Sequence, residues 1–369
     1  MTNGNLAALA AAGVSIWLDD LNRTLIDSGT LAEYLDELAV VGVTTNPAIF
    51  KSAIAGGDAA YDEGISSALA SADGATGSEL VDHVVRELTT EDVRRACDVL
   101  APVYENSRGV DGRVSLEVDP RLAHDTESTV AQALELAAEV DRPNVMIKIP
   151  ATDEGLPAIS RVLAEGIDVN VTLIFSPERY EQVARAYMSG LAAAHANGHD
   201  ISNIHSVASV FVSRLDTEVD DRLDAASELR GKAGLAGARL CHAVFEELLQ
   251  SEEWRELAAA GAEPQRLLWA STGVKNPDYP DTMYVTGLVT HGTVNTLPLG
   301  TIMAFAEHGE VTGDTVRGTA EASREVFTDL REAGIDTDEV FELLEKQGVE
   351  KFVTAWADLY EAVSGRLEK

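Results

Sequence analysis

The length, composition and charge of the chain limit what it can be. It has 369 residues, of which 45% are hydrophobic, and this is enough for one large core or for two domains. With 62 acidic against 28 basic residues its formal charge is −34, which opposes binding to nucleic acid and to anionic membrane surfaces. An anionic small substrate stays compatible with this charge, because a few lysines and arginines can make a cleft locally positive.

The sequence has no pattern for export or for membrane insertion. It does not begin with a basic segment followed by a long apolar one, and it has no run of about 18 apolar residues. Its two cysteines, Cys97 and Cys241, each lie in a helix-like pattern, which is typical of small buried hydrophobic residues rather than of a disulfide. We therefore expect a soluble protein in a reducing cytoplasm.

Eight short runs rich in β-branched residues alternate with helical patterns. The runs are residues 14–20, 41–46, 113–119, 144–150, 168–175, 206–213, 266–272 and 292–298. Alternating strands and helices favour an α/β protein with a parallel sheet. Eight such units favour a (β/α)₈ TIM barrel over an open doubly wound sheet, and no glycine-rich nucleotide-binding fingerprint supports the open sheet.

Two of the helices have readable start signals. Thr30 and Glu33 form a capping-box pattern ahead of an apolar periodicity that stops near Gly42. Ser176 is in the N-cap position with Pro177 in the first helical position. The second helix is expected to bury Tyr180, Val183, Ala184, Tyr187 and Leu191.

Two stretches exceed the repeat of the barrel. Residues 51–112 follow the second strand and carry long helical patterns, and the residues after about 300 contain several helices. Neither stretch has a Pro/Gly/Ser-rich linker of the kind that marks a domain boundary. We expect one domain over residues 1–369, with helical additions after strand two and at the C-terminus.

Lys148 is the one cation in the apolar run NVMIKIP. Desolvating an ammonium is costly and favours the neutral amine, which is a nucleophile. Lys148 is therefore a candidate Schiff-base lysine that attacks a sugar carbonyl. The alternative is a lysine at a strand end whose amine reaches water.

Polar residues follow the strands at their carboxyl ends, where the chemistry of a barrel lies. Each of them alone is compatible with a structural role, but the set of an acid, a lysine, hydroxyls and amides fits carbonyl chemistry. The set comprises Asp19, Asp20, Thr45, Asn46, Glu117, Asp119, Lys148, Asn170, Thr172, Ser209, Phe211, Ser213, Arg214, Ser271 and Lys275.

Six segments in order resemble the successive signatures of transaldolases. They are GVTTNPAIF, RVSLEVDPRL, NVMIKIPAT, VNVTLIFS, ASVFVSRLD and TVNTLP, and the resemblance extends from residue 14 to about residue 300. It implies a (β/α)₈ barrel of the class I aldolase type, with Lys148 as the Schiff-base lysine on the fourth strand. It also implies that no cofactor and no metal take part.

The resemblance further implies roles for individual residues. Asp19 matches the acid/base acting on the C4 hydroxyl of the substrate, with Asp20 as the second candidate. Glu117 and Thr172 match the pair that holds a catalytic water. Hydrogen bonds to the dihydroxyacetone unit are implied for Asn46, Asn170 and Ser209, and phosphate binding for Arg214 and Ser271.

One position departs from the family pattern. Where better-known members carry an arginine soon after the seventh strand, this chain has Lys275, which binds phosphate as a point charge without a bidentate fork. The expected substrates are sugar phosphates, and a monomer and a homodimer are both compatible with the sequence. The implied reaction, a step of the non-oxidative pentose phosphate pathway, transfers a dihydroxyacetone unit from sedoheptulose 7-phosphate or fructose 6-phosphate to an aldose phosphate such as glyceraldehyde 3-phosphate.

Three alternatives remain open from the sequence. A related Schiff-base aldolase would release free dihydroxyacetone. In such relatives the water site resembles a glutamine with a nearby tyrosine, whereas this chain has Glu117 and Phe211, as transaldolases do. A metal-dependent enzyme would find its best ligands in His195 and His199, which lie at a helix end without an obvious acidic ligand. A barrel used only for binding is the third, and a turnover assay would distinguish it.

Overall fold

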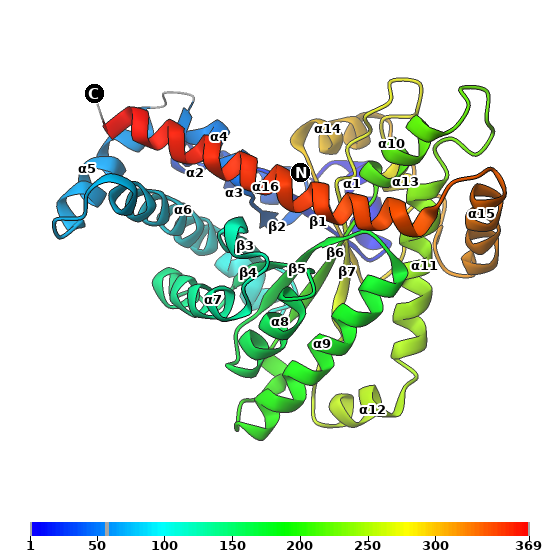
Figure 1. Ribbon diagram of the computed structural model, residues 1–369, viewed down its shortest axis with the longest axis horizontal. Coiled ribbons are helices and arrows are strands. Elements are labelled where there is room, and N and C mark those ends of the chain that lie inside the picture. The colour runs from blue at the N-terminus through cyan, green and yellow to red at the C-terminus, as the bar shows by residue number, and fades with distance from the viewer. Residues whose placement is uncertain (1, 56–58, 368–369) are drawn as a thin grey trace.

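The computed structural model describes residues 2–55 and 59–367, and its eight parallel strands close into a barrel in the order β1 to β8 (Figure 1). The strands are β1 Val14–Leu18, β2 Val40–Thr44, β3 Arg113–Glu117, β4 Val145–Pro150, β5 Val169–Ile174, β6 Ser206–Phe211, β7 Arg266–Ala270 and β8 Thr293–Leu297. All eight predicted strands are confirmed, as is the predicted (β/α)₈ barrel.

Helices surround the barrel and add to it. The α-helices are α1 Gly4–Ala11, α2 Arg23–Asp27, α3 Thr30–Glu37, α4 Pro47–Ala55, α5 Asp62–Ser71, α6 Gly77–Asn106, α7 Thr126–Val140, α8 Gly155–Ala164, α9 Pro177–Ala196, α10 Ser213–Arg222, α11 Ala233–Leu248, α12 Glu252–Ala259, α13 Met283–Thr286, α14 Leu299–His308, α15 Ala320–Glu332 and α16 Thr337–Leu367. Short 3₁₀ turns are η1 Ala59–Tyr61, η2 Pro120–Leu122 and η3 Ile201–Asn203. The predicted additions correspond to α4–α6 and to the helices from α14 onward.

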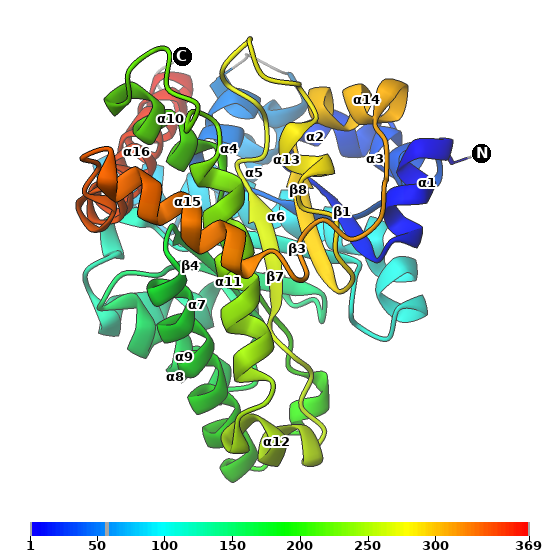
Figure 2. The same ribbon diagram turned by 90° about the vertical axis from the view of Figure 1, so that its right-hand side faces the viewer.

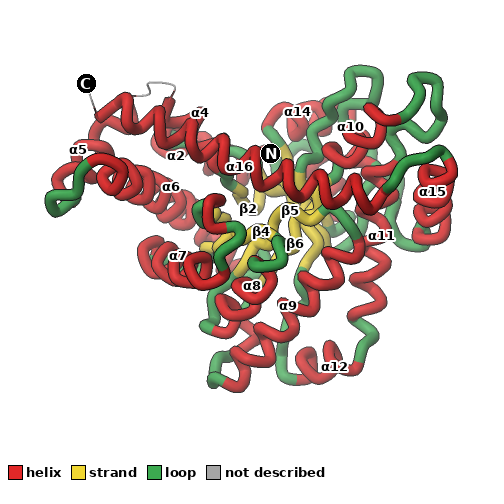
Figure 3. The backbone as a smooth tube through the Cα atoms, viewed as in Figure 1, coloured by secondary structure: helices red, strands yellow, loops and turns green. Residues whose placement is uncertain are grey.

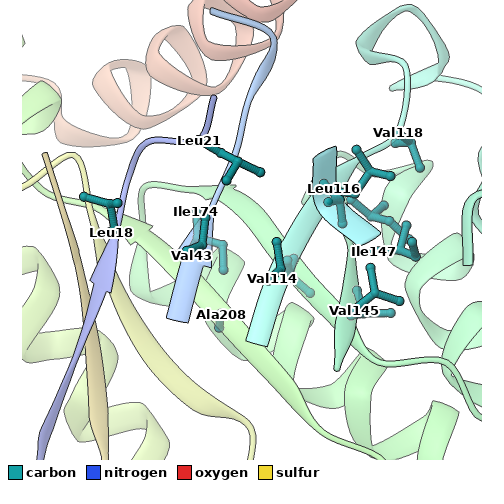
Figure 4. Packing of buried hydrophobic residues seen from close by; sticks show 14 of the residues in the cluster. Leu18, Leu21, Val43, Val114, Leu116, Val118, Val145, Ile147, Ile174 and Ala208 are labelled. Carbon is teal, nitrogen blue, oxygen red and sulfur yellow. The ribbon is translucent and has the colours of Figure 1, made fainter. Parts of the chain in front are cut away.

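Apolar side chains from neighbouring strands fill the space between the sheet and its helices. Figure 4 shows Val43, Val114 and Ile147 on β2, β3 and β4, and all three are fully buried. Burying a side chain of this size stabilises the fold by roughly 1.5–3 kcal/mol. Nearly all strand residues are buried, because the helices cover the outer face and the packed interior covers the inner one.

The predicted start and stop of the first capping-box helix are wrong. Thr30 is the first residue of α3, and Gly29 takes the N-cap position at φ +80° without a side-chain hydrogen bond. The helix ends at Glu37, and Gly42 lies inside β2. A Cβ at Gly42 would lie 2.5 Å from the Trp17 ring, so this glycine allows close packing of β1 on β2 rather than ending a helix.

The second predicted helix is confirmed. The Ser176 side chain accepts a hydrogen bond from the Arg179 backbone N–H, and Pro177 begins α9. The five side chains expected on its inner face are buried. Cys97 and Cys241 are buried free thiols.

The C-terminal helix α16 crosses the carboxyl ends of the barrel strands (Figures 1 and 3). It contacts α4, η2, α10 and β5, which are all elements at or near that end of the barrel. The turned view in Figure 2 shows α1 near α14 on another side of the molecule, where the side chains of Asn3 and Asn5 donate to the Ala306 carbonyl at 3.1 and 3.2 Å. None of the helices within residues 2–55 and 59–367 is long and apolar enough to cross a membrane.

Candidate active site

A pocket of about 190 Å³ opens at the carboxyl ends of the strands. Its position follows from the barrel, because parallel strands bring their last residues and the following loops to one rim. Nine of the predicted site residues line it: Asp19, Asn46, Lys148, Thr172, Ser209, Phe211, Arg214, Ser271 and Lys275.

Lys148 is buried in the barrel mouth and is 5% exposed. Its Nζ donates to the Thr45 carbonyl at 3.1 Å and lies 3.5 Å from Oε2 of Glu117. The neighbouring-strand register sets this pair, because Glu117 of β3 is opposite Lys148 of β4. The amine therefore does not reach bulk water as a strand-end lysine would, and it has an acid beside it.

Glu117 is 6% exposed, and its carboxyl group is strongly perturbed. Burial raises the pKa of Glu117 to about 7, and the positive charge of Lys148 opposes that rise. Near neutral pH this side chain can give or take a proton, which is the property of a general acid/base.

Two buried oxygens make no hydrogen bond within the described residues: Oγ1 of Thr172, and Oε2 of Glu117, which has only the Lys148 Nζ at 3.5 Å as an ionic neighbour. Thr172 is paired with Pro150 of β4, but on its other side the β5–β6 register is irregular between Val171 and Ile174. A buried polar atom without a partner is costly and is compatible with a bound water or substrate group. The two residues predicted to hold a catalytic water thus both retain free hydrogen-bonding capacity.

Asn170 does not line the pocket and is fully buried. Its amide donates to Ser115 Oγ at 2.9 Å, and its Oδ1 accepts from Ser209 Oγ at 2.7 Å. Of this hydrogen-bonded chain, Ser209 borders the pocket. Both the oxygen and the nitrogen of the Asn170 side chain thus have partners within the barrel. Asn170 therefore orients Ser209, which borders the pocket, and does not itself face it.

The structure distinguishes the two aspartates after β1. Asp19 lines the pocket and accepts a hydrogen bond from Thr44 Oγ1 at 2.8 Å. Asp20 points into a different cavity beside Asn22 and Ala48, and burial raises its pKa. Asp19 is therefore the aspartate that shares a pocket with Lys148.

Basic and hydroxyl groups also line the pocket. Arg214 packs over the Phe211 ring, with Cζ 4.9 Å from the ring centroid, and its Nη1 is buried without a hydrogen-bond partner among the described residues. Ser271 at φ +54° faces Ser213, with their Oγ atoms 3.0 Å apart. Ser213 was predicted at a strand end, but it is the first residue of α10. Lys275 is exposed on the following loop.

A second and larger cavity of about 400 Å³ lies next to the lysine pocket. Asn46 borders both cavities, whereas Glu117 borders only the larger one. The basic residues that line the larger cavity, Arg86 and Arg121, are already paired with carboxylates. The two cavities adjoin at Asn46, and Glu117 borders the larger one while its carboxyl group contacts Lys148 of the other.

Among the pocket residues that sequence reasoning missed, Thr44, Thr296 and Phe352 have the side chains that bear on the chemistry. The hydroxyls of Thr44 and Thr296 lie 2.6 Å apart beside Asp19, and their place at the ends of β2 and β8 was a usable signal. Phe352 comes from α16 and had no such signal, because nothing local shows which helix crosses a barrel mouth.

The two histidines of the metal-dependent alternative lie far from this chemistry. His195 is in the last turn of α9, and His199 follows that helix at the surface. Within the described residues, no group of three or more His, Cys, Asp or Glu side chains is placed to hold a metal ion.

The fold and the site define a (β/α)₈ barrel enzyme whose mouth holds a buried lysine beside a carboxyl group. The profile of the family described as Transaldolase/Fructose-6-phosphate aldolase matches residues 16–363. The chain belongs to this family.

Curated relatives cover nearly the whole chain. A protein of Mycolicibacterium smegmatis named Transaldolase is 57% identical over 99% of this chain and 98% of its own length. A protein of Saccharopolyspora erythraea with the same name is 57% identical over 100% of this chain and 99% of its own length. One of Mycobacterium tuberculosis, also named Transaldolase, is 56% identical over 99% of this chain and 98% of its own length. The predicted resemblance is confirmed, and the match extends past residue 300 into α16.

Proposed function

We propose that this chain is a transaldolase that transfers a dihydroxyacetone unit from sedoheptulose 7-phosphate or fructose 6-phosphate to an aldose phosphate such as glyceraldehyde 3-phosphate. The observation that carries the proposal is a buried Lys148 with its Nζ 3.5 Å from Glu117 at the carboxyl end of the barrel. The name shared by relatives 57% identical over almost the full length supports it.

Lys148 is the nucleophile of the proposed reaction. Its neutral amine attacks the C2 carbonyl of the ketose, and loss of water gives an iminium ion whose positive charge accepts electrons. Glu117 donates and accepts the protons of this dehydration and of its reverse, aided by a water that Thr172 and Glu117 hold. Within the part of the chain that the structure describes, Thr172 Oγ1 and Glu117 Oε2 accept no hydrogen bond, which supports that role.

Asp19 acts on the bond that breaks. It accepts the proton of the C4 hydroxyl as the C3–C4 bond cleaves, and the aldose phosphate leaves while the enamine stays on Lys148. An acceptor aldehyde is then attacked by the enamine carbon, and Asp19 returns the proton to the new hydroxyl. Its place in the pocket beside Thr44 supports this assignment over Asp20.

The remaining residues bind substrate. Asn46 and Ser209 hydrogen-bond the hydroxyls of the dihydroxyacetone unit, with Asn170 acting through Ser209. Arg214, Ser271 and Lys275 hold the phosphate, and Phe211 packs beneath the Arg214 guanidinium. Arg214 Nη1 has no hydrogen-bond partner among residues 2–55 and 59–367, and this supports an anionic ligand, because a buried guanidinium nitrogen without a partner is costly.

Borohydride trapping tests the proposal. Borohydride with fructose 6-phosphate should leave a reduced three-carbon adduct on Lys148, detected by intact mass and peptide mapping. Lys148→Met should form no adduct and lose turnover while its circular dichroism stays native. An adduct on another lysine, or turnover without any adduct, would overturn the assignment, and free dihydroxyacetone as the sole product would identify an aldolase instead.

The organisation of the whole chain is also a proposal. We propose that residues 1–369 act as one domain, because the C-terminal helix α16 packs on α4, α6, α10 and β5 and does not form a separate unit with its neighbours in sequence. A reducing cytoplasm is proposed from the two buried free cysteines, and either a monomer or a homodimer is compatible with this site.

A further inference from the structure

The C-terminal helix places an aromatic ring over the proposed nucleophile. Phe352 is 8% exposed and lines the same pocket as Lys148, whose Nζ lies 5.6 Å from the centroid of its ring. The ring belongs to an apolar cluster that also contains Leu173, Phe175 and Phe211. One wall of the lysine pocket is thus apolar and comes from an element outside the eight βα units.

A close approach between α16 and β5 sets the position of this ring. A Cβ at Gly348 would lie 2.9 Å from Leu173 Cδ2, so the glycine lets the helix lie directly on that side chain. Leu173 is at φ +62°, in the irregular stretch of β5, and is 1% exposed. Phe352 is one helical turn beyond Gly348, on the same face of α16, and this spacing brings it over the lysine.

Ion pairs hold α16 on both sides of the ring. Towards its N-terminus, Glu345 lies 3.1 Å from Nε of Arg179 on α9. Towards its C-terminus, Asp358 lies 3.1 Å from Lys51 of α4, and the Arg366 guanidinium donates to the Ile54 carbonyl at 3.1 Å. The helix is therefore fastened to the barrel before and after Phe352, which makes the apolar cover a fixed part of the pocket.

The chemistry of the proposed transfer makes such a cover consequential. After cleavage the enamine on Lys148 has two fates. Its carbon can attack an acceptor aldehyde, which forms a carbon–carbon bond and retains the three-carbon unit. Alternatively the carbon takes a proton, the resulting iminium ion adds water, and the C–N bond breaks to release free dihydroxyacetone and the amine. Both fates end in hydrolysis of an iminium ion, which consumes one water in each case. They differ in the first step, because only release requires a proton donor at the enamine carbon, so keeping proton-donating water from that carbon favours transfer.

We propose that Phe352 is a specificity-determining residue that keeps proton-donating water from the enamine carbon and thereby favours transfer over release of dihydroxyacetone. This inference rests on the proposed function. It assigns to α16 a chemical role in addition to its packing on the barrel. The ring does not exchange protons, and its effect is on the partition between the two fates rather than on formation of the adduct.

The partition between the fates is measured directly. Wild type, Phe352→Ala and Phe352→Leu are incubated with fructose 6-phosphate and erythrose 4-phosphate, and both the transfer product and free dihydroxyacetone are quantified. The ratio of released to transferred unit should rise about tenfold or more in Phe352→Ala and less in Phe352→Leu, which retains an apolar side chain. The lifetime of the borohydride-trappable adduct, followed without acceptor, should shorten in the same order.

A matched control lies in the same helix. Phe341 packs on Phe327 of α15, with ring centroids 5.9 Å apart, and does not line the pocket. Phe341→Ala should lower stability and leave the ratio at the wild-type value.

Each result decides the proposal. An unchanged ratio and adduct lifetime in both Phe352 variants would overturn it, as would an equal rise in Phe341→Ala. If Phe352→Ala forms no adduct, Phe352→Leu decides in the same way. Failure of wild type to form an adduct or to transfer would refute the proposed function instead.

Discussion

At the scale of single residues, the site depends on a carboxyl group whose proton is held unusually tightly. Burial raises the pKa of Glu117 to about 7 from an ordinary value of 4.5, although Lys148 beside it favours the ionised form. A group tuned to neutral pH suits both proton donation and proton acceptance in one catalytic cycle. The same tuning has a cost in stability, because the folded protein resists ionising this side chain while the unfolded chain does not.

That cost predicts how Glu117→Gln changes stability with pH. Because the folded-state pKa is the higher one, the stabilising contribution of the Glu117 proton is full below about pH 4.5 and is lost as the pH rises to about 7. The free energy of unfolding in urea is measured for wild type and for Glu117→Gln at each pH. The wild-type value minus the variant value should fall by about 1–3 kcal/mol between pH 5 and pH 7 and then level off. A difference that is constant or rises over this range would contradict the perturbed carboxyl.

Lys275 predicts an effect confined to phosphorylated substrates. Lys275→Ala should raise KM for fructose 6-phosphate by roughly tenfold, the scale of one charge-assisted hydrogen bond, and leave the poor use of unphosphorylated sugar unchanged. Lys275→Arg should bind phosphate at least as well, because a guanidinium can add a second hydrogen bond. Lys346→Ala, a charge removal on α16 outside the pocket, is the matched control. Equal losses on both kinds of sugar would place the phosphate elsewhere.

At the scale of elements, the long helix α6 is joined to α2 by a buried ion pair. Asp92 accepts from Arg23 Nε at 2.8 Å and from the Tyr61 hydroxyl at 2.7 Å, and the aspartate is fully buried. Removing one partner of a buried pair leaves the other charge without compensation, which costs more than the pair itself contributes. The helices inserted between β2 and β3 thus depend on a polar contact rather than on apolar packing alone.

This contact predicts unequal effects of the same substitution at two places on α6. Asp92→Asn should lower the free energy of unfolding by about 3 kcal/mol or more, because Arg23 keeps its charge in a buried site. Asp98→Asn removes an exposed pair with Arg142 and should cost under about 1 kcal/mol. Urea denaturation of the two variants checks this, and similar losses in both would show that Arg23 reaches water.

At the scale of the whole molecule, a formal charge of −34 must be tolerated by a folded chain that binds anions. Like charges on a compact surface repel one another, and salt screens this repulsion over about 10 Å at 0.1 M. The basic groups of the pocket, Arg214 and Lys275, act locally and at short range. Substrate binding and global repulsion are therefore separable by ionic strength.

Screening predicts that stability rises with salt. Increasing NaCl from about 0.02 to 0.5 M should raise the Tm by a few degrees, because relief of net repulsion exceeds the small loss from exposed ion pairs. Differential scanning calorimetry at constant pH checks this expectation. A Tm that falls with salt would mean that the surface ion pairs stabilise the fold more than the excess negative charge destabilises it.

The sequence by itself determined the barrel and singled out Lys148 as the candidate nucleophile. All eight strands were predictable because strand and helix periodicities are local patterns. The barrel was predictable because eight alternating strands and helices favour closure of the parallel sheet. Lys148 was recognisable because a cation in an apolar run conflicts with its neighbours. The start and the end of the helix α3 were misplaced. Gly29 in a left-handed conformation takes the N-cap position instead of Thr30, and Gly42, expected near the helix end, lies in β2 against Trp17.

Only the tertiary structure decided which side chains meet. Asp19 and Asp20 are adjacent in sequence, and the direction of the chain after β1 sends one into the lysine pocket and the other away from it. Asn170 alternates onto the predicted face, but its partners are on β3 and β6, which only closure of the barrel brings together. Phe352 is about 200 residues from Lys148, and its place depends on the non-local packing of α16 on β5, which no local pattern encodes.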